Sequence, residues 1–208
     1  MWAYILLLLS EPAVAAADVE FVPRLWEPPA SFPETLRDVA SRLPPGTEAK
    51  DADLVTYAHE GTHFLCRGNG QFHGLYLGNG LRVFVKHPPI RTVDVFDSVP
   101  ESQRDATWRT YRNQAATEYW RDRPLMILDE WNAYRMGCLA RRELGLESRA
   151  ETIRHCGTFA ELAVRLHNMA SHCEGYPMTD LTDYCRLHLD LCRQAVPAWD
   201  QQFSISFD

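Results

Sequence analysis

The sequence is poor in positive charge: 21 Lys and Arg residues stand against 28 Asp and Glu residues in a chain of 208, so the formal net charge is −7. A protein that binds nucleic acid without regard to base sequence needs a basic surface, so we expect no nucleic-acid partner. After the N-terminus there is no apolar run long enough for a membrane helix, so we expect no stable membrane anchor. Internal repeats and low-complexity tracts are also missing, which excludes solenoid and fibrous architectures.

The composition that remains is that of a globular protein with a buried core, at 46% hydrophobic and 24% charged residues. The length suits one domain of ordinary size, and no segment is a convincing interdomain linker. We therefore expect a single domain over residues 18–208.

The first 17 residues have the pattern of a secretory signal peptide. The apolar run Tyr4–Leu9 is followed by a proline and then by small residues, and either Ala13–Ala15 or Ala15–Ala17 would suit signal peptidase. Asp18 would be the first residue of the mature chain. The alternative is a buried N-terminal helix or strand. The signal peptide predicts a secreted protein, in the extracellular space or the periplasm.

Six cysteines form an even set, and an exported chain would meet an oxidising environment. Cys185 and Cys192 are seven residues apart and would share one helix face. We therefore expect disulfide bonds among the C-terminal helices, although 15 pairings are open. There is no C-x-x-C pair, so a zinc ribbon or a thioredoxin-like motif has no support.

The order of the local patterns predicts an α+β fold, mainly helical with a small β-hairpin sheet. Two apolar runs on either side of Gly78–Gly80 predict the hairpin, and Arg91–Phe96 could add a third strand. Helical periodicity and helix-breaking residues predict helices at about 33–43, 52–66, 100–120, 125–144, 149–172 and 179–195.

The sequence feature that most clearly indicates a chemical function is one H-E-x-x-H motif, which lies in the predicted helix over 52–66. Residues four apart share a helix face, so His59 and His63 can present two imidazoles to one metal ion. Glu60 then lies next to the first ligand, where a carboxylate can take a proton from a water activated by zinc. The composition predicts only about 0.02 chance occurrences of this motif.

These residues resemble the zincin superfamily of zinc metallopeptidases. The resemblance covers the His59–His63 motif and one downstream helix, a minor part of the chain. After His63 the sequence has no H-x-x-G-x-x-H continuation, so the metzincin pattern is absent. A gluzincin-like site fits better, and this resemblance implies a Glu from a later helix as third zinc ligand.

Glu130 is our choice for that ligand. It belongs to an acidic pair that interrupts the apolar helix predicted over 125–144, and a buried carboxylate needs a partner such as a metal ion. Asp129 or Asn132 could orient a ligand from behind. The alternatives for the third ligand are Asp129, Glu118, His73 and His87.

The sequence thus predicts a secreted zinc-dependent metallopeptidase. Zn²⁺ would be bound by His59, His63 and Glu130 with water in the fourth position, and Glu60 would act as general base. The partner would be a peptide or protein substrate. A non-catalytic, disulfide-stapled zinc-binding module and a zinc amidase acting on a non-protein substrate are the alternatives.

Other parts of the expected site are open at this stage. An extended substrate could lie along a sheet edge such as Leu75–Leu77 or Leu81–Val85. The donor to the developing oxyanion could be any of several residues, namely Tyr111, Tyr119, Tyr134 or His73. The histidines of the C-terminal helices have no ligand-like spacing and are predicted to be structural; they are His155, His167, His172 and His188.

Overall fold

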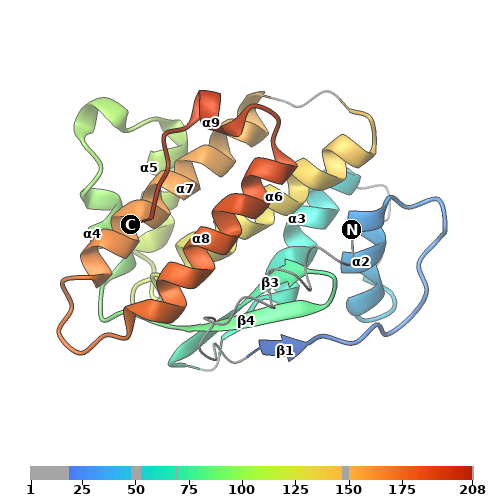
Figure 1. Ribbon diagram of the computed structural model, residues 1–208, viewed down its shortest axis with the longest axis horizontal. Helices are drawn as coiled ribbons and strands as arrows, with labels where there is room; N and C mark the ends of the chain where they lie inside the picture. Colours follow the sequence, from blue (N-terminus) through green and yellow to red (C-terminus); the bar gives the residue numbers. More distant parts are fainter. Residues whose placement is uncertain (1–18, 48–52, 69, 147–149, 208) are drawn as a thin grey trace.

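The computed structural model describes residues 19–47, 53–68, 70–146 and 150–207. These residues form an α+β fold in which a small antiparallel sheet lies along one edge of a larger group of helices (Figure 1). The helices and strands are β1 (Val19–Phe21), α2 (Glu34–Arg42), α3 (Leu54–Leu65), β2 (Arg67–Gly68), β3 (Phe72–Gly78), β4 (Leu81–Lys86), α4 (Thr92–Asp97), η1 (Glu101–Gln103), α5 (Ala106–Ala115), α6 (Met126–Glu143), α7 (Ala150–Ala170), α8 (Met178–Ala195) and α9 (Trp199–Gln202).

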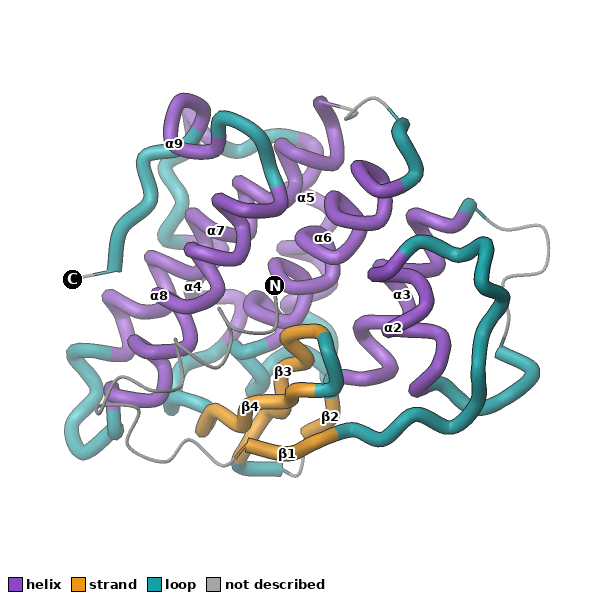
Figure 2. The backbone as a smooth tube through the Cα atoms, turned by 45° about the vertical axis from the view of Figure 1, so that its right-hand side comes forward, coloured by secondary structure: helices purple, strands orange, loops and turns teal. Residues whose placement is uncertain are grey.

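The predicted hairpin is confirmed as β3 and β4. Asn79 and Gly80 both have positive φ, at 53° and 83°, which is the backbone that a two-residue hairpin turn needs and that Asn-Gly tolerates. The sheet order is β1-β4-β3-β2, so the hairpin is central and has a short strand on each side (Figure 2). Neither flanking strand has a local sequence signal.

The third strand predicted over Arg91–Phe96 is wrong, because the chain forms α4 there. Thr92, Val95 and Phe96 are fully buried, and these positions have the i, i+3, i+4 spacing of one helix face. The alternating letters of this short segment resembled a strand, but the buried set has helical period.

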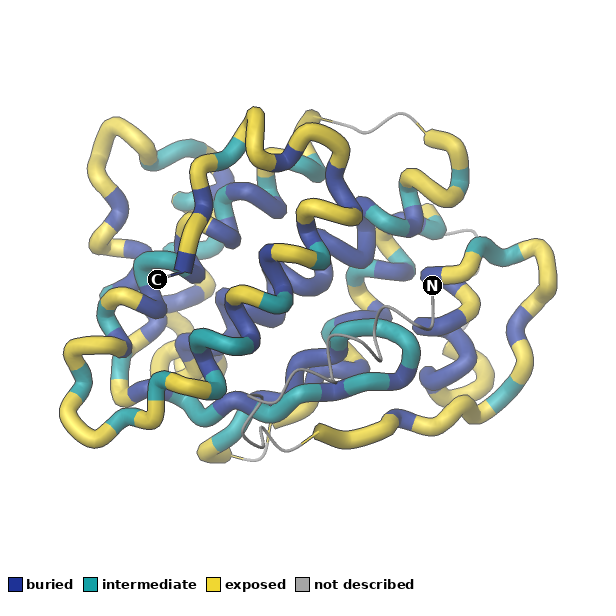
Figure 3. Tube along the Cα trace, in the orientation of Figure 1, coloured by how far each residue is buried: buried dark blue, intermediate teal, exposed yellow. Residues whose placement is uncertain are grey.

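The long helices are confirmed at α6, α7 and α8, within a few residues at each end. The segment 100–120 contains a shorter helix than predicted, since α5 begins after Asp105 caps Trp108 N and ends at Ala115. α8 has an inner buried face and an outer exposed face, whereas α6 is buried over most of its length between α3 and α7 (Figure 3).

Two glycines let α3 approach its neighbours closely. A Cβ on Gly61 would lie 2.6 Å from Val39 Cγ1 of α2, a distance that real side chains do not show. On α6, Gly137 packs against α3, where a Cβ would meet His59 Cβ at 3.9 Å, an ordinary van der Waals contact. These contacts fix α3 between α2 and α6, and thereby fix where its histidines point.

The disulfide bonds expected among the helices are not present in the structure, although all six cysteines are described. Cys138, Cys156 and Cys192 come from three different helices, and the Cys156 thiol interacts with each of the other two. Cys66 lies apart from them and accepts a hydrogen bond from Tyr76 N at 3.3 Å. The five buried cysteines fill the core as small apolar groups, and Cys173 is half-buried.

Two expectations concern the termini and the membrane. The predicted signal peptide, residues 1–17, lies outside the described residues. Of the helices that the structure describes, none has the length and apolar character needed to cross a bilayer.

Candidate metal centre

α3 presents the two histidines of the H-E-x-x-H motif. The helix starts where the Asp53 side chain accepts a hydrogen bond from Val55 N, which satisfies one of its free N–H groups. His59 and His63 lie one turn apart and are half-buried on the side of α3 that faces α6. Their Nε2 atoms are 3.2 Å apart, so both rings point at the same spot.

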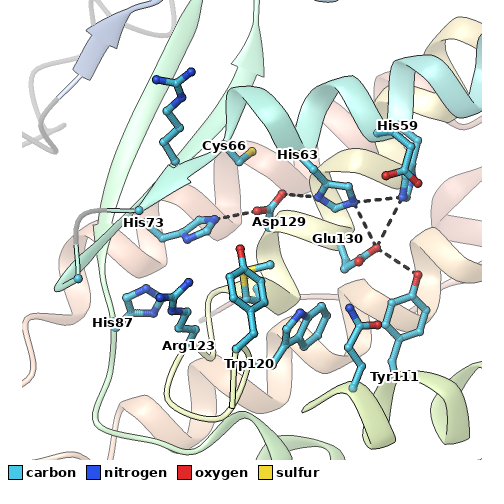
Figure 4. Close-up of a pocket in the computed structure, with 17 residues that line it drawn as sticks. His59, His63, Cys66, His73, His87, Tyr111, Trp120, Arg123, Asp129 and Glu130 are labelled. Atoms are coloured by element: carbon cyan, nitrogen blue, oxygen red, sulfur yellow. Dashed lines mark hydrogen bonds and ion pairs between the residues drawn. The ribbon is translucent and has the colours of Figure 1, made fainter. Parts of the chain in front are cut away.

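α6 supplies the third group of this cluster. Glu130 is 6% exposed, and its Oε2 atom lies 3.7 Å from the Nε2 atom of each histidine. All three candidate ligand atoms lie within 4.8 Å of one another, close enough to hold one metal ion (Figure 4). The structure therefore brings together the three residues that the sequence predicted as ligands, namely His59, His63 and Glu130.

The alternative third ligands do not join this cluster. Glu118 is exposed and does not line the pocket that contains the histidines. His73 and His87 line the same pocket, but at a distance from His59 (Figure 4). Asp129 has a different function: its two oxygens each bind a histidine.

Asp129 links His63 to His73. His63 Nδ1 donates to Asp129 Oδ1 at 2.8 Å, and His73 Nε2 donates to Oδ2 at 2.8 Å. A carboxylate in this position fixes the ring of His63 and leaves its Nε2 lone pair free for a metal. This is the orienting function that the sequence analysis gave to Asp129 or Asn132. Asn132 instead donates to the Tyr76 carbonyl and so holds α6 to the sheet.

The two histidines of the motif have opposite pKa shifts. Burial, followed by the nearby His63, lowers the pKa of His59 to about 3. Burial also disfavours the His63 cation, but the hydrogen bond and charge of Asp129 outweigh it and raise the pKa of His63 to about 9. The His59 ring is further held by a hydrogen bond to the backbone at Ala133. At neutral pH the metal-free site thus has one neutral and one charged imidazole.

The pKa values of the two buried carboxylates, Asp129 and Glu130, are also shifted in opposite directions. Asp129 is buried, but its hydrogen bonds to His63 and His73 lower its pKa to about 2. Burial, reinforced by the charge of Asp129, raises the pKa of Glu130 to about 7. Among the described residues, no Lys or Arg lies within ion-pair distance of Glu130; only His59 and His63 do. A metal cation bound between the two histidines would supply the positive charge that the buried Glu130 carboxylate needs as a partner.

Glu60 lies beside this cluster and on the solvent side of it. Its side chain is exposed and lines the same pocket, and its charge contributes to raising the pKa values of both His63 and Glu130. An acidic group that faces the pocket next to a candidate metal position is free to exchange protons with water and substrate.

Two tyrosines close the other side of the cluster. The Tyr111 hydroxyl donates to Glu130 Oε2 at 3.2 Å and is 2.8 Å from the Tyr134 hydroxyl. Burial, with the charge of Glu130, raises the pKa of Tyr111, so its proton is retained. Among the candidate oxyanion donors, Tyr111 is the one whose hydroxyl is on this cluster and which also lines the pocket. Tyr119 is 60% exposed, and His73 is bound to Asp129.

The cluster forms part of the wall of a cavity of about 680 Å³. The sheet edges that the sequence analysis proposed for substrate are not available there. The carbonyls of Tyr76 and Leu77 on β3 accept from Asn132 and Arg135 of α6, and Leu81–Val83 of β4 pairs with a strand on each side. The pocket instead reaches β2, the end strand of the sheet, through Arg67 and Gly68.

Comparison with family models, with curated protein sequences and with solved structures found no match. Any proposal about function therefore rests on the geometry of the site.

Proposed function

We propose that this chain is a zinc-dependent peptidase with a zincin-like, gluzincin-type centre. The observation that carries the proposal is the convergence of His59, His63 and Glu130 within 4.8 Å, from two helices packed side by side. A Glu from a helix beside the H-E-x-x-H helix is what the gluzincin resemblance implies. The small antiparallel sheet that borders the pocket is compatible with a compact member of that fold class.

The donor set suits zinc. Two imidazole nitrogens and one carboxylate oxygen are the protein ligands of many catalytic zinc sites, where an open position remains for water or substrate. Asp129 and the Ala133 backbone already hold the rings of His63 and His59 in place. Bound zinc would act as a Lewis acid and lower the pKa of a water molecule.

The chain's own residues would then perform the proton transfers. Glu60, exposed to the pocket, accepts a proton from the attacking water and returns it to the leaving nitrogen. The Tyr111 hydroxyl keeps its proton, and it would give up its hydrogen bond to Glu130 Oε2 to donate instead to a carbonyl oxygen as that oxygen gains negative charge. Glu130 and Asp129 hold the metal end of the site and transfer no proton.

A peptide fits the pocket better than a compact non-protein amide. Among the described residues no strand pairs with the outer edge of β2, which borders the pocket at Arg67 and Gly68. An extended peptide could add to this edge through main-chain hydrogen bonds. A non-catalytic zinc module is disfavoured, since a structural site is closed by four protein ligands and this cluster has three beside an open pocket.

Secretion is part of this proposal. It rests on the sequence pattern of residues 1–17 alone, because the structure describes none of them. The free cysteines of the structure give no support to the disulfide-stapled alternative.

Metal analysis combined with one conservative variant tests the proposal. Purified protein should contain about one zinc per chain, because the described residues include one cluster of this kind. Glu60→Gln should retain zinc but lower peptide hydrolysis by about 10²–10⁴-fold, since the general base is lost and no ligand is. Glu34→Gln, an exposed glutamate on α2, is the matched control and should leave both unchanged. Absence of zinc from the wild type, or equal turnover by wild type and Glu60→Gln, would refute a zinc peptidase.

A further inference from the structure

Charge is unevenly distributed along the pocket. The acidic groups that line it, Glu60, Asp129 and Glu130, all belong to α3 and α6 at the metal end. Arg123 and His87 lie at the opposite end of the pocket, away from His59 (Figure 4). The pocket thus has a candidate metal position at one end and a basic end without acidic residues of its own.

Arg123 is exposed at the pocket and has no acidic ion-pair partner among the described residues. It lies in the turn segment before α6, where Arg123 N donates to Trp120 O at 2.9 Å and Trp120 is buried. Its guanidinium lies 4.7 Å from the centre of the Tyr119 ring, a cation–π contact that steadies the side chain. Within the described residues it forms no ion pair. The guanidinium group of arginine can bind a planar anion through two parallel hydrogen bonds.

His87 adds an unused polar atom at the same end. Its Nδ1 atom is buried and has no hydrogen-bond partner among the described residues. Burial, followed by the charges of His73 and Arg123, lowers the pKa of His87 to about 4, which also places Arg123 near this ring. A buried polar atom without a partner is costly, and a ligand in the pocket would remove that cost if the His87 ring turned to bring Nδ1 to it.

We propose that this basic end is a subsite for a carboxylate of the substrate, bound by the Arg123 guanidinium and the neutral His87 imidazole. One fixed positive charge and one neutral donor suit a group with a single negative charge. The carboxylate would be either the C-terminus of the peptide or an acidic side chain, while the bond to be cleaved lies at His59, His63 and Glu130. This inference rests on the proposed function and names its substrate class. A cavity of about 680 Å³ can hold both groups of such a substrate.

The test uses the full chain loaded with zinc and a set of paired probes. Each probe is the mono-hydroxamate of a straight-chain dicarboxylic acid, from succinate to suberate, because a hydroxamate binds zinc and the chain length then sets where the carboxylate lies. Its partner is the same molecule with the carboxylate converted to a primary amide. Isothermal titration calorimetry gives Kd for the wild type, Arg123→Gln and Arg37→Gln. Arg37 is exposed on α2 outside the pocket, so its variant controls for the loss of one positive charge.

At the best chain length the acid should bind the wild type at least about tenfold more tightly than the amide, as expected for a charge-assisted hydrogen-bonded pair. Arg123→Gln should lose this preference, and Arg37→Gln should keep it. If acid and amide bind equally well at every length, the zinc centre stands but the subsite does not exist. A preference retained in Arg123→Gln also overturns the subsite. If neither probe binds, the zinc centre itself fails, and the subsite falls with it.

Peptide cleavage then separates the two sources of the carboxylate. Matched peptides with a free or an amidated C-terminus form one pair, and peptides with Glu or Gln in the sequence form the other. The value of kcat/KM should favour the carboxylate in one of these pairs, and Arg123→Gln should remove that advantage. The pair that shows the effect identifies whether the C-terminus or a side chain occupies the subsite. If neither pair shows an advantage that depends on Arg123, the substrate carries no carboxylate there and the proposal is wrong.

Discussion

Two groups of buried or half-buried histidines in this chain have opposite surroundings. His63 and His73 are each bound 2.8 Å from an oxygen of Asp129, and His59 faces His63 and Glu130. On α8, His188 is fully buried between aromatic rings, 4.4 Å from the centre of Trp131 and 5.4 Å from that of Tyr184.

His63 differs in protonation from the core histidines, whereas His59, with a pKa of about 3, is neutral like them. Asp129 raises the pKa of His63 to about 9, whereas burial and then the charge of Arg135 hold the pKa of His188 well below its ordinary value. His167, which shares a hydrogen bond with the Thr182 hydroxyl at 2.9 Å, also has a pKa lowered by burial. Burial alone therefore makes a neutral core histidine. A histidine becomes available to a metal when carboxylates and a second imidazole converge on it.

The largest expected effect is loss of the metal when a ligand is removed. His63→Ala and Glu130→Ala should each weaken zinc binding by orders of magnitude and abolish hydrolysis, because three protein ligands become two. Glu118→Ala should leave zinc binding unchanged, since Glu118 is exposed and outside the pocket. Competition with a chelator of known affinity measures the three constants. Tight zinc binding by Glu130→Ala together with its loss in Glu118→Ala would show that the third ligand was assigned to the wrong residue.

The next effect is a dependence of zinc affinity on pH. His63 must be neutral to bind a metal, and its pKa in the metal-free protein is raised to about 9. Zinc therefore displaces one proton below that pH, so its affinity should rise about tenfold per pH unit from about 7 to 9 and then level off. In Asp129→Ala the pKa of His63 should fall, and the slope in this window should disappear. A flat profile in the wild type would show that His63 is not a ligand, or that Asp129 does not hold its proton.

A smaller loss of zinc affinity is expected when the residues that hold the His63 ring in place are substituted. At pH 9 or above, where no proton competes with zinc at His63, Asp129→Ala should weaken zinc binding by about 10–100-fold, the usual cost of removing a carboxylate that orients a metal-binding histidine. His73→Gln should cost less than Asp129→Ala, because His73 acts only through the second oxygen of Asp129. The same chelator competition measures both. Equal losses in the two variants would mean that His73 contributes directly, as the sequence analysis allowed when it named His73 among the alternative ligands.

The metal cluster was predictable because its signals are local. Four-residue spacing on a helix places His59 and His63 on one face, and an acidic pair inside an apolar helix marks Glu130 as a buried carboxylate. Asn79-Gly80 likewise specifies its own turn. Each of these inferences needs only a few consecutive residues.

The rest of the site depends on contacts between distant segments. The pairing of His73 with Asp129 requires that β3 lie on α6, and nothing near either residue in the sequence indicates it. Arg123 could not be singled out for the same reason, since its proposed role depends on the cavity that it lines and on its having no ion-pair partner among the described residues. The cysteines were misjudged because an even count suggests pairing, whereas the packed helices leave the side chains as free thiols.

The smallest effect on zinc affinity is expected from replacing His188, which belongs to the group of histidines away from the metal cluster. His188→Leu should leave zinc affinity unchanged, because His188 is not among the residues that line the pocket. The substitution removes the partner of the Tyr184 hydroxyl, which is 3.3 Å from His188 Nδ1 and belongs to a side chain only 2% exposed. A buried hydroxyl without a partner should lower the free energy of unfolding by about 1–3 kcal/mol. The double variant with Tyr184→Phe removes that hydroxyl as well and should recover part of the loss, which chemical denaturation measures. A change in zinc affinity without a change in stability would place His188 with the site histidines and erase the distinction between the two groups.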